Sequence, residues 1–142
     1  MLKSQGIIKV DPSNGRIVVD VSRDFIEYYN YFITREYWIK LHLPLHGSHI
    51  TIANKKLHAG VKWDSAMKYH NRIVEFEYDE YLIRGGYTKG FIMFYIKVYS
   101  VMIDNMKKDL KIVERPDYRG LHITISNGKS GVSLYWPEMI TL

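Results

Sequence analysis

Apolar and polar residues alternate over several short runs of the chain, and this pattern is typical of β-strands with one buried face. Two such runs, residues 7–11 and 16–21, flank a Pro12 to Gly15 turn segment. An Asn14-Gly15 step between β-rich runs indicates a tight hairpin. The alternation returns at residues 49–54, where it predicts a further strand.

The second half of the chain repeats this strand-rich character. Residues 73–84 and 91–99 predict two strands joined around residues 85–88, which begin with Gly85-Gly86. After a turn containing Pro116 and Gly120, residues 121–127 predict another strand. Both halves of the chain therefore carry hairpin and strand signals.

Two of the remaining segments have the hydrophobic periodicity of helices. Ser22 is a suitable N-cap for a helix that runs to about residue 41, before Pro44. Its apolar positions recur at helical spacing: Phe25, Ile26, Tyr29, Phe32, Ile33 and Ile39. Ser100 caps a second predicted helix over residues 101–112, and residues 55–72 predict a loop or a short helix. Without any low-complexity linker, the pattern predicts one α+β domain over residues 1–142.

Composition narrows the classes of protein that this sequence can belong to. The 142 residues are 46% hydrophobic, enough for one core, and they include no cysteine, which excludes disulfides and thiolate metal sites. The most apolar run, residues 91–103, is interrupted by Lys97 and is too short to span a bilayer. With no apolar signal region at the start, we expect a cytoplasmic protein without membrane partners. A net charge of +5 favours an anionic partner, and the 14% aromatic content favours stacking on bases.

The most informative motif is an internal repeat. The hexapeptide HITIAN at residues 49–54 recurs as HITISN at residues 122–127, about half the chain later, with one substitution. Successive side chains of a strand point to opposite faces. Each histidine therefore shares a face with the threonine two positions later, and the isoleucines pack beneath. If the two halves are related by a pseudo-twofold axis, the two motifs meet on one surface.

Such a surface suits transfer at phosphorus without a metal or other cofactor. One group must take a proton from the nucleophile and another must give a proton to the leaving oxygen. Imidazole titrates near neutral pH, so His49 and His122 can serve in either role. The hydroxyls of Thr51 and Thr124 can donate to the non-bridging oxygens. A lone His-x-Thr triplet is common in proteins, but two near-identical hexapeptides in one short chain favour a catalytic pair.

The duplicated motif resembles that of the 2H phosphoesterase superfamily. The resemblance extends over the chain in layout, although only the two hexapeptides match specifically. It implies a bilobal α+β fold, RNA ligase-like, with two antiparallel sheets around a central groove and flanking helices. It also implies His49 and His122 as the catalytic pair, Thr51 and Thr124 as phosphate contacts, and the substrate's own 2′-hydroxyl as a nucleophile.

Within that superfamily, the small size and the Tyr/Trp-rich ends look most similar to phage anti-CBASS nucleases, which destroy cyclic oligonucleotide signals. The resemblance thus implies hydrolysis of cyclic dinucleotides or trinucleotides to evade antiviral immunity, in the host bacterial cytoplasm. Two alternatives stay open. One is cleavage of RNA 2′,3′-cyclic ends or 2′,5′-oligoadenylate, and the other is a nucleotide sponge that binds without cutting. The sequence leaves the oligomeric state open.

Several other residues are candidates for binding the substrate. Trp136 can stack on a base and Glu138 can accept a hydrogen bond from a base edge or a ribose hydroxyl; equally, this tail can simply pack against a sheet edge. Trp63, with Lys62 beside it, follows the first motif, and Tyr87 lies on the predicted Gly85-Gly86 turn.

A metal site is the competing interpretation of the histidines. His42, His46 and His49 have the spacing of ligands on one helix face. Pro44 and Gly47 interrupt any helix there, and no carboxylate lies nearby in the sequence. We therefore expect no metal.

Overall fold

A computed structural model describes residues 1–37, 47–55, 58, 60–85, 91–114, 120–129 and 139–141. Its strands are β1 (Leu2–Asp11), β2 (Arg16–Asp20), β3 (His49–Asn54), β4 (Ile73–Tyr78), β5 (Tyr81–Gly85), β6 (Phe91–Tyr99), β7 (His122–Lys129) and β8 (Met139–Thr141). Its helices are α1 (Asp24–Tyr37), α2 (Trp63–Ala66), the 3-10 turn η1 (Met67–Tyr69) and α3 (Val101–Asp109).

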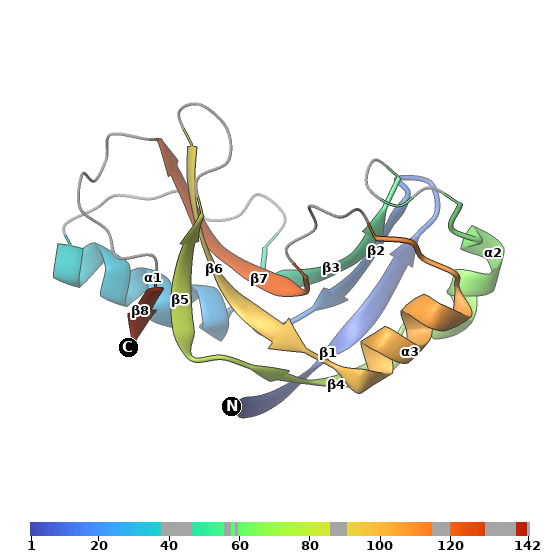
Figure 1. Ribbon diagram of the computed structural model, residues 1–142, viewed down its shortest axis with the longest axis horizontal. Helices are drawn as coiled ribbons and strands as arrows, with labels where there is room; N and C mark the ends of the chain where they lie inside the picture. The colour runs from blue at the N-terminus through green and yellow to red at the C-terminus, as the bar shows by residue number, and fades with distance from the viewer. Residues whose placement is uncertain are drawn as a thin grey trace.

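The strands form one antiparallel sheet in the order β4-β1-β2-β3-β7-β6-β5-β8. Because β4 pairs with β1 on one side and with β6 on the other, six of the strands close into a barrel. Beyond this ring, β5 continues along β6 and β8 pairs with β5. The result is an antiparallel barrel with an extension at one end (Figure 1).

This barrel corrects the predicted fold class. The expectation of a bilobal α+β fold, with two sheets facing each other across a groove, is wrong. The physical reason lies in two junctions, β3 with β7 and β1 with β4, which hydrogen-bond strands from the two halves of the chain into a single sheet. The pairing of β4 with β6 then closes the ring. The helices are also few in the described residues and short, at 14, 4 and 9 residues for α1, α2 and α3.

The predicted hairpins are confirmed in position. β1 and β2 pair from Ile7 opposite Asp20 to Asp11 opposite Arg16, around a turn in which Gly15 has a φ of 64°. The stretch predicted as one strand over residues 73–84 is divided into β4 and β5, and β6 runs along both. The short strand β8 has no counterpart among the predicted elements.

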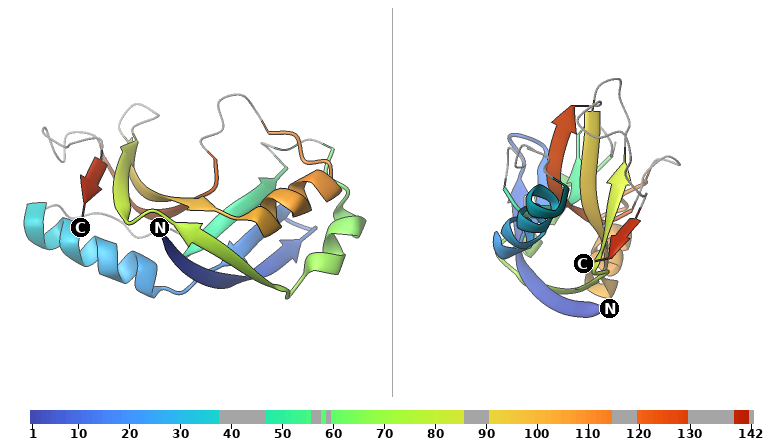
Figure 2. Two further views of the ribbon diagram at one scale, coloured as in Figure 1. Left: turned by 60° about the horizontal axis from the view of Figure 1, so that its bottom comes forward. Right: turned by 90° about the vertical axis from the view of Figure 1, so that its left-hand side faces the viewer.

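Both predicted helices begin where their serine caps indicated. The Ser22 hydroxyl accepts a hydrogen bond from the Asp24 N–H at 3.2 Å, and the Ser100 hydroxyl accepts one from the Ile103 N–H at 3.2 Å. The predicted end of the first helix near residue 41 lies outside the described residues. α1 lies towards one end of the barrel, whereas α2 and α3 lie towards the other (Figure 1 and Figure 2).

The core fills the inside of the barrel. Alternating strand positions supply most of it, α1 and α3 add Tyr29, Ile33, Ile103 and Met106, and Leu110 directly follows α3. The strand residues whose exposure is nearly zero include Ile17, Val19, Ile50, Ile52, Ala53, Val74, Leu82, Phe94, Ile96, Ile123, Ile125 and Ser126. Every isoleucine of the two hexapeptide motifs therefore points inward, which leaves the motif histidines and threonines on the outer face.

Candidate functional site

The two repeated motifs lie side by side because β3 pairs antiparallel with β7. Ile50 lies directly opposite Ile123. The antiparallel direction then sets His49 towards Thr124 and Thr51 towards His122. Figure 1 shows the two strands meeting near the middle of the molecule and running away from each other. The pair Ile50 and Ile123 thus marks a local pseudo-twofold axis between the motifs.

Four polar side chains share the outer face around this axis. His49, Thr51, His122 and Thr124 are all partly exposed, whereas Ile50 and Ile123 beneath them are fully buried. The two histidines are diagonal neighbours across the strand pair, a relation that places residues about 7–8 Å apart. That spacing leaves room for a phosphate group between the two imidazoles.

Each histidine is oriented by the same backbone contact. The Nδ1 atom of His49 lies 3.0 Å from the Gly47 carbonyl oxygen, and the Nδ1 atom of His122 lies 2.9 Å from the Gly120 carbonyl oxygen. A carbonyl oxygen only accepts, so Nδ1 must carry the hydrogen in both rings. The Nε2 atom of each ring is then the nitrogen that gains or loses a proton, as a general base or acid requires.

The two carbonyl acceptors belong to glycines in the left-handed backbone region, with φ of 74° at Gly47 and 83° at Gly120. An added Cβ would meet no atom within 4 Å at either position, so backbone conformation rather than space favours glycine there. Sequence reasoning missed these residues. Their signal was present, because the glycine two positions before each histidine extends the repeat to Gly-x-His-Ile-Thr-Ile.

A further likeness between the motifs is a register shift after each threonine. Val18 pairs with Thr51 and Ile17 with Ala53, so Ile52 is skipped. In the other half, Tyr95 pairs with Thr124 and Phe94 with Ser126, so Ile125 is skipped. The skipped isoleucines occupy equivalent positions of the two hexapeptides. The repeat is therefore a repeat of backbone structure as well as of residue types.

The strands flanking the motifs contribute residues that the sequence did not single out. On β2, Asp20 is opposite His49, and on β6, Lys97 is opposite His122. Tyr95 is opposite Thr124 and packs edge-on against His122, with ring centroids 5.3 Å apart. No spacing rule in the sequence reveals these neighbours, because strand pairing brings them together.

The predicted substrate-binding residues fall into two groups. Trp63 begins α2 and packs half-buried against the core, while Lys62 beside it is exposed. No contact in the described residues joins either of them to the histidine face. Tyr87, Trp136 and Glu138 lie outside the described residues.

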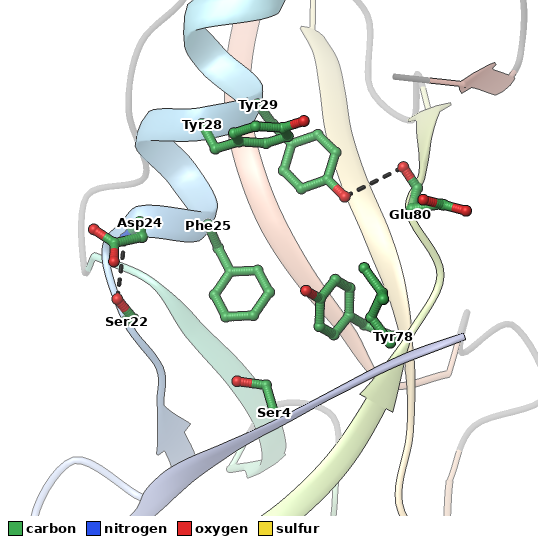
Figure 3. A pocket seen from close by; sticks show the side chains of 9 residues that line it. Ser4, Ser22, Asp24, Phe25, Tyr28, Tyr29, Tyr78 and Glu80 are labelled. Carbon is green, nitrogen blue, oxygen red and sulfur yellow. Dashed lines mark hydrogen bonds between the residues drawn. The ribbon is translucent and has the colours of Figure 1, made fainter.

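A separate pocket of about 430 Å³ lies between α1, the start of β1 and the bend between β4 and β5. Figure 3 shows Phe25, Tyr28 and Tyr29 of α1 facing Tyr78 across it. The Tyr29 hydroxyl donates to the Glu80 carbonyl oxygen at 3.2 Å, and burial raises the pKa of Tyr29 to about 12. The charged residues of the lining are Asp24 and Glu80, both acidic, so this pocket does not suit a phosphate.

The described part of the chain contains no group of three or more His, Asp or Glu side chains placed to hold a metal ion. His42 and His46, the other members of the alternative metal triad, lie outside it. None of its helices is long and apolar enough to cross a membrane. Comparisons with protein-family models, with curated proteins and with solved structures found no match.

Proposed function

We propose that this protein is a phosphodiesterase that needs no metal and cuts nucleotide phosphodiesters between His49 and His122. One observation carries the proposal. Two imidazoles on one face have the same tautomer, fixed by equivalent Nδ1 contacts to glycine carbonyls at 3.0 and 2.9 Å. A pure binding module has no need for two titratable groups held in matching orientations.

The proposed reaction uses the substrate's own 2′-hydroxyl. One Nε2 removes the hydroxyl proton while the oxygen attacks phosphorus, and the other Nε2 protonates the departing oxygen. Thr51 and Thr124 occupy the other diagonal of the same four-residue cluster. In the proposed reaction their hydroxyls donate to the non-bridging oxygens, where negative charge increases in the transition state. The Thr124 hydroxyl, which donates to Met93 Sδ at 3.8 Å, would turn to the phosphate.

Cyclic dinucleotides and trinucleotides are the substrate class that we place first. Their phosphates complement a chain of net charge +5, and such signals occur in the bacterial cytoplasm, where we expect the protein to act. The duplicated motif supports a relation to the 2H phosphoesterases and their phage anti-CBASS members. The closed barrel differs from the two-sheet arrangement that the resemblance implied, so the proposal depends on the paired histidines.

The test is a cleavage assay with the purified protein in the presence of EDTA. The panel contains cyclic dinucleotides and trinucleotides, 2′,5′-oligoadenylate and RNA with 2′,3′-cyclic ends, and products are resolved by chromatography. We expect opening of the cyclic substrates and a loss on the order of 10²- to 10⁴-fold in His49→Ala and His122→Ala. His70→Ala is the matched control, because its Nδ1 accepts from the Val10 N–H at 3.0 Å, away from the histidine face.

Each other outcome has a definite meaning. Cleavage restricted to the linear or 2′,3′-cyclic substrates, still dependent on both histidines, would move the protein to RNA processing. Tight binding without cleavage would identify a nucleotide sponge. Parental activity in a His49→Ala/His122→Ala double variant would refute the catalytic pair.

A further inference from the structure

We propose that Asp20 and Lys97 make the two histidines unequal, so that His49 is the general acid and His122 the general base. This inference rests on the proposed function. It adds two positioning residues and assigns a direction to proton transfer, neither of which the symmetry of the motifs provides.

The symmetry of the site ends at the flanking strands. Across β2, β3, β7 and β6, one row of side chains is Asp20, His49, Thr124 and Tyr95, and the next is Val18, Thr51, His122 and Lys97. Asp20 and Lys97 occupy equivalent positions beside their histidines, and both are exposed. Residues directly opposite on neighbouring strands have Cβ atoms about 4.5–5.5 Å apart. Each imidazole therefore has a charged residue directly opposite it on the flanking strand, and these two residues have opposite signs.

These two charges are available to act on the imidazoles. Across the described ranges, neither Asp20 nor Lys97 forms an ion pair with another residue. Within these four strands, the other positions of the two rows are the neutral side chains of Thr124, Tyr95, Val18 and Thr51. On β1, Ile7 is opposite Asp20 and Lys9 is opposite Val18, and the Lys9 ammonium already donates to Asn71 Oδ1 at 2.6 Å.

Lys97 also lines a hollow of about 280 Å³ together with Gly120 and Leu121, which directly precede His122. The other charged residues in this lining are Asp104 and Lys107 of α3 and Glu114. Lys107 and Glu114 are paired with each other. Two carboxylates could offset Lys97. Asp104 lies on α3, and Asp79 follows β4, where its N–H donates to the Lys97 carbonyl oxygen at 3.1 Å. The Asp79 carboxylate already accepts a hydrogen bond from the Tyr99 hydroxyl at 3.3 Å.

Because Asp20 and Lys97 have opposite charges, they have opposite effects on the protonation of the two imidazoles. A carboxylate favours the charged imidazolium, so His49 keeps a proton to give. An ammonium disfavours the imidazolium, so His122 stays neutral and its Nε2 can accept a proton. In the cleavage step, the 2′-oxygen bonds to phosphorus as its proton moves to His122. The bond from phosphorus to the 5′-oxygen breaks as that oxygen takes a proton from His49. The products are a 2′,3′-cyclic phosphate and a free 5′-hydroxyl.

The test compares leaving groups. A dinucleoside monophosphate needs an acid to protonate its alkoxide, whereas the matching nucleoside 3′-(4-nitrophenyl phosphate) releases a stable phenolate without one. The base is chosen from the cleavage panel. We expect His49→Ala to lose roughly 10²- to 10⁴-fold on the dinucleotide but far less on the nitrophenyl ester. We expect His122→Ala to lose a similar factor on both substrates.

The effect of Asp20 and Lys97 on the histidines is measured separately, from the pH dependence of kcat/KM. Asp20→Asn should move the alkaline limb to lower pH, because the acid loses its proton more easily. Lys97→Gln should move the acidic limb to higher pH, because the base gains a proton more easily. Each shift should be up to about one pH unit. Asp104→Asn is the control, and it should leave the alkaline limb in place.

The outcomes separate the two proposals. If the parental protein cleaves both substrates but the two histidine variants lose activity equally on each, or with the roles reversed, the assignment is overturned and the phosphodiesterase stands. If the flanking variants leave both limbs unmoved, Asp20 and Lys97 are not positioning residues. If the parental protein cleaves neither of these substrates nor any member of the cleavage panel, the proposed function itself fails.

Discussion

Ile50 lies directly opposite Ile123, and both side chains are fully buried. This pair is the junction through which the two halves of the chain join into one sheet at the motifs. The pair is apolar and inward-facing, so the residues on either side of it in each strand must face outward. Two histidines and two threonines therefore meet on the surface because two isoleucines meet in the core.

The first prediction concerns this pair. Ile50→Val and Ile123→Val should each lower the free energy of unfolding by about 1 kcal/mol, because each removes one buried methylene. In the double variant the losses should not add, since the two residues are direct cross-strand neighbours. Denaturant unfolding measures all three variants. Ile7→Val on the exposed face of β1 is the control and should change stability little, and strict additivity in the double variant would contradict the packing described.

The motif threonines give a second prediction. Thr51→Val and Thr124→Val keep the shape of the side chain but remove the hydroxyl, so turnover should fall by roughly 10²- to 10³-fold. Thr→Ser at the same positions keeps the donor and should retain most of the activity. The measurement is kcat on the best substrate of the panel. A valine variant as active as its serine counterpart would exclude phosphate contact by that hydroxyl.

A third prediction separates backbone strain from orientation of the imidazole. Gly120→Ala and Gly60→Ala both force a side chain into the left-handed region, at a φ of 83° in each case, with open space for the Cβ. Both should cost about 1–2 kcal/mol of stability. Only Gly120 supplies the carbonyl that holds His122, so Gly120→Ala should also lose roughly 10- to 100-fold in turnover. Equal turnover in the two variants would show that the glycine contact does not position the ring.

The buried His58 predicts a dependence of stability on pH. Its side chain is 2% exposed, and its pKa is lowered, first by burial and then by the nearby Lys107. Above about pH 6.5 the imidazole is neutral in both the folded and the unfolded chain. Below that pH the imidazole is protonated in the unfolded chain but stays neutral in the folded protein. The free energy of unfolding should therefore fall by at most about 1.4 kcal/mol per pH unit.

Unfolding curves from pH 8 to pH 5, for the parental protein and for His58→Asn, measure this effect. Other groups titrate in both proteins, so the relevant quantity is the difference between them. We expect the stability advantage of the parental protein to shrink as the pH falls below about 6.5. An advantage that stays constant over the range would mean that His58 takes up its proton equally in both states.

The end of α3 gives a prediction for gain of stability. Lys111 follows the helix with a φ of 54°, while the Lys111 N–H donates to Lys108 O and the Ile112 N–H donates to Lys107 O. This is the Schellman geometry, in which glycine is preferred at the left-handed position. Lys111→Gly should therefore raise the free energy of unfolding by about 0.5–1 kcal/mol. Lys108→Gly, inside the helix, should lower it by about 1 kcal/mol, and thermal unfolding distinguishes the two.

The strand and helix positions were largely predictable because they depend on neighbours along the chain. The alternation at residues 49–54, the Asn14-Gly15 turn and the caps Ser22 and Ser100 each act within a few residues. The bend that divides β4 from β5 was missed, since the sequence run continues through it. The prediction of a two-sheet fold was wrong for a different reason: local sequence patterns do not determine which strand edges pair with each other.

The sequence by itself determined the chemistry of the candidate site. It specified two Gly-x-His-Ile-Thr-Ile segments, and the period of a strand alone divides each segment into an outward polar face and an inward apolar face. Only the tertiary structure decided that the segments lie side by side, with the barrel closed through β4 and β6. It also placed an aspartate beside one histidine and a lysine beside the other. The physical reason is that strand alternation follows from the geometry of one backbone, whereas pairing depends on hydrogen bonds and packing between segments far apart in the chain.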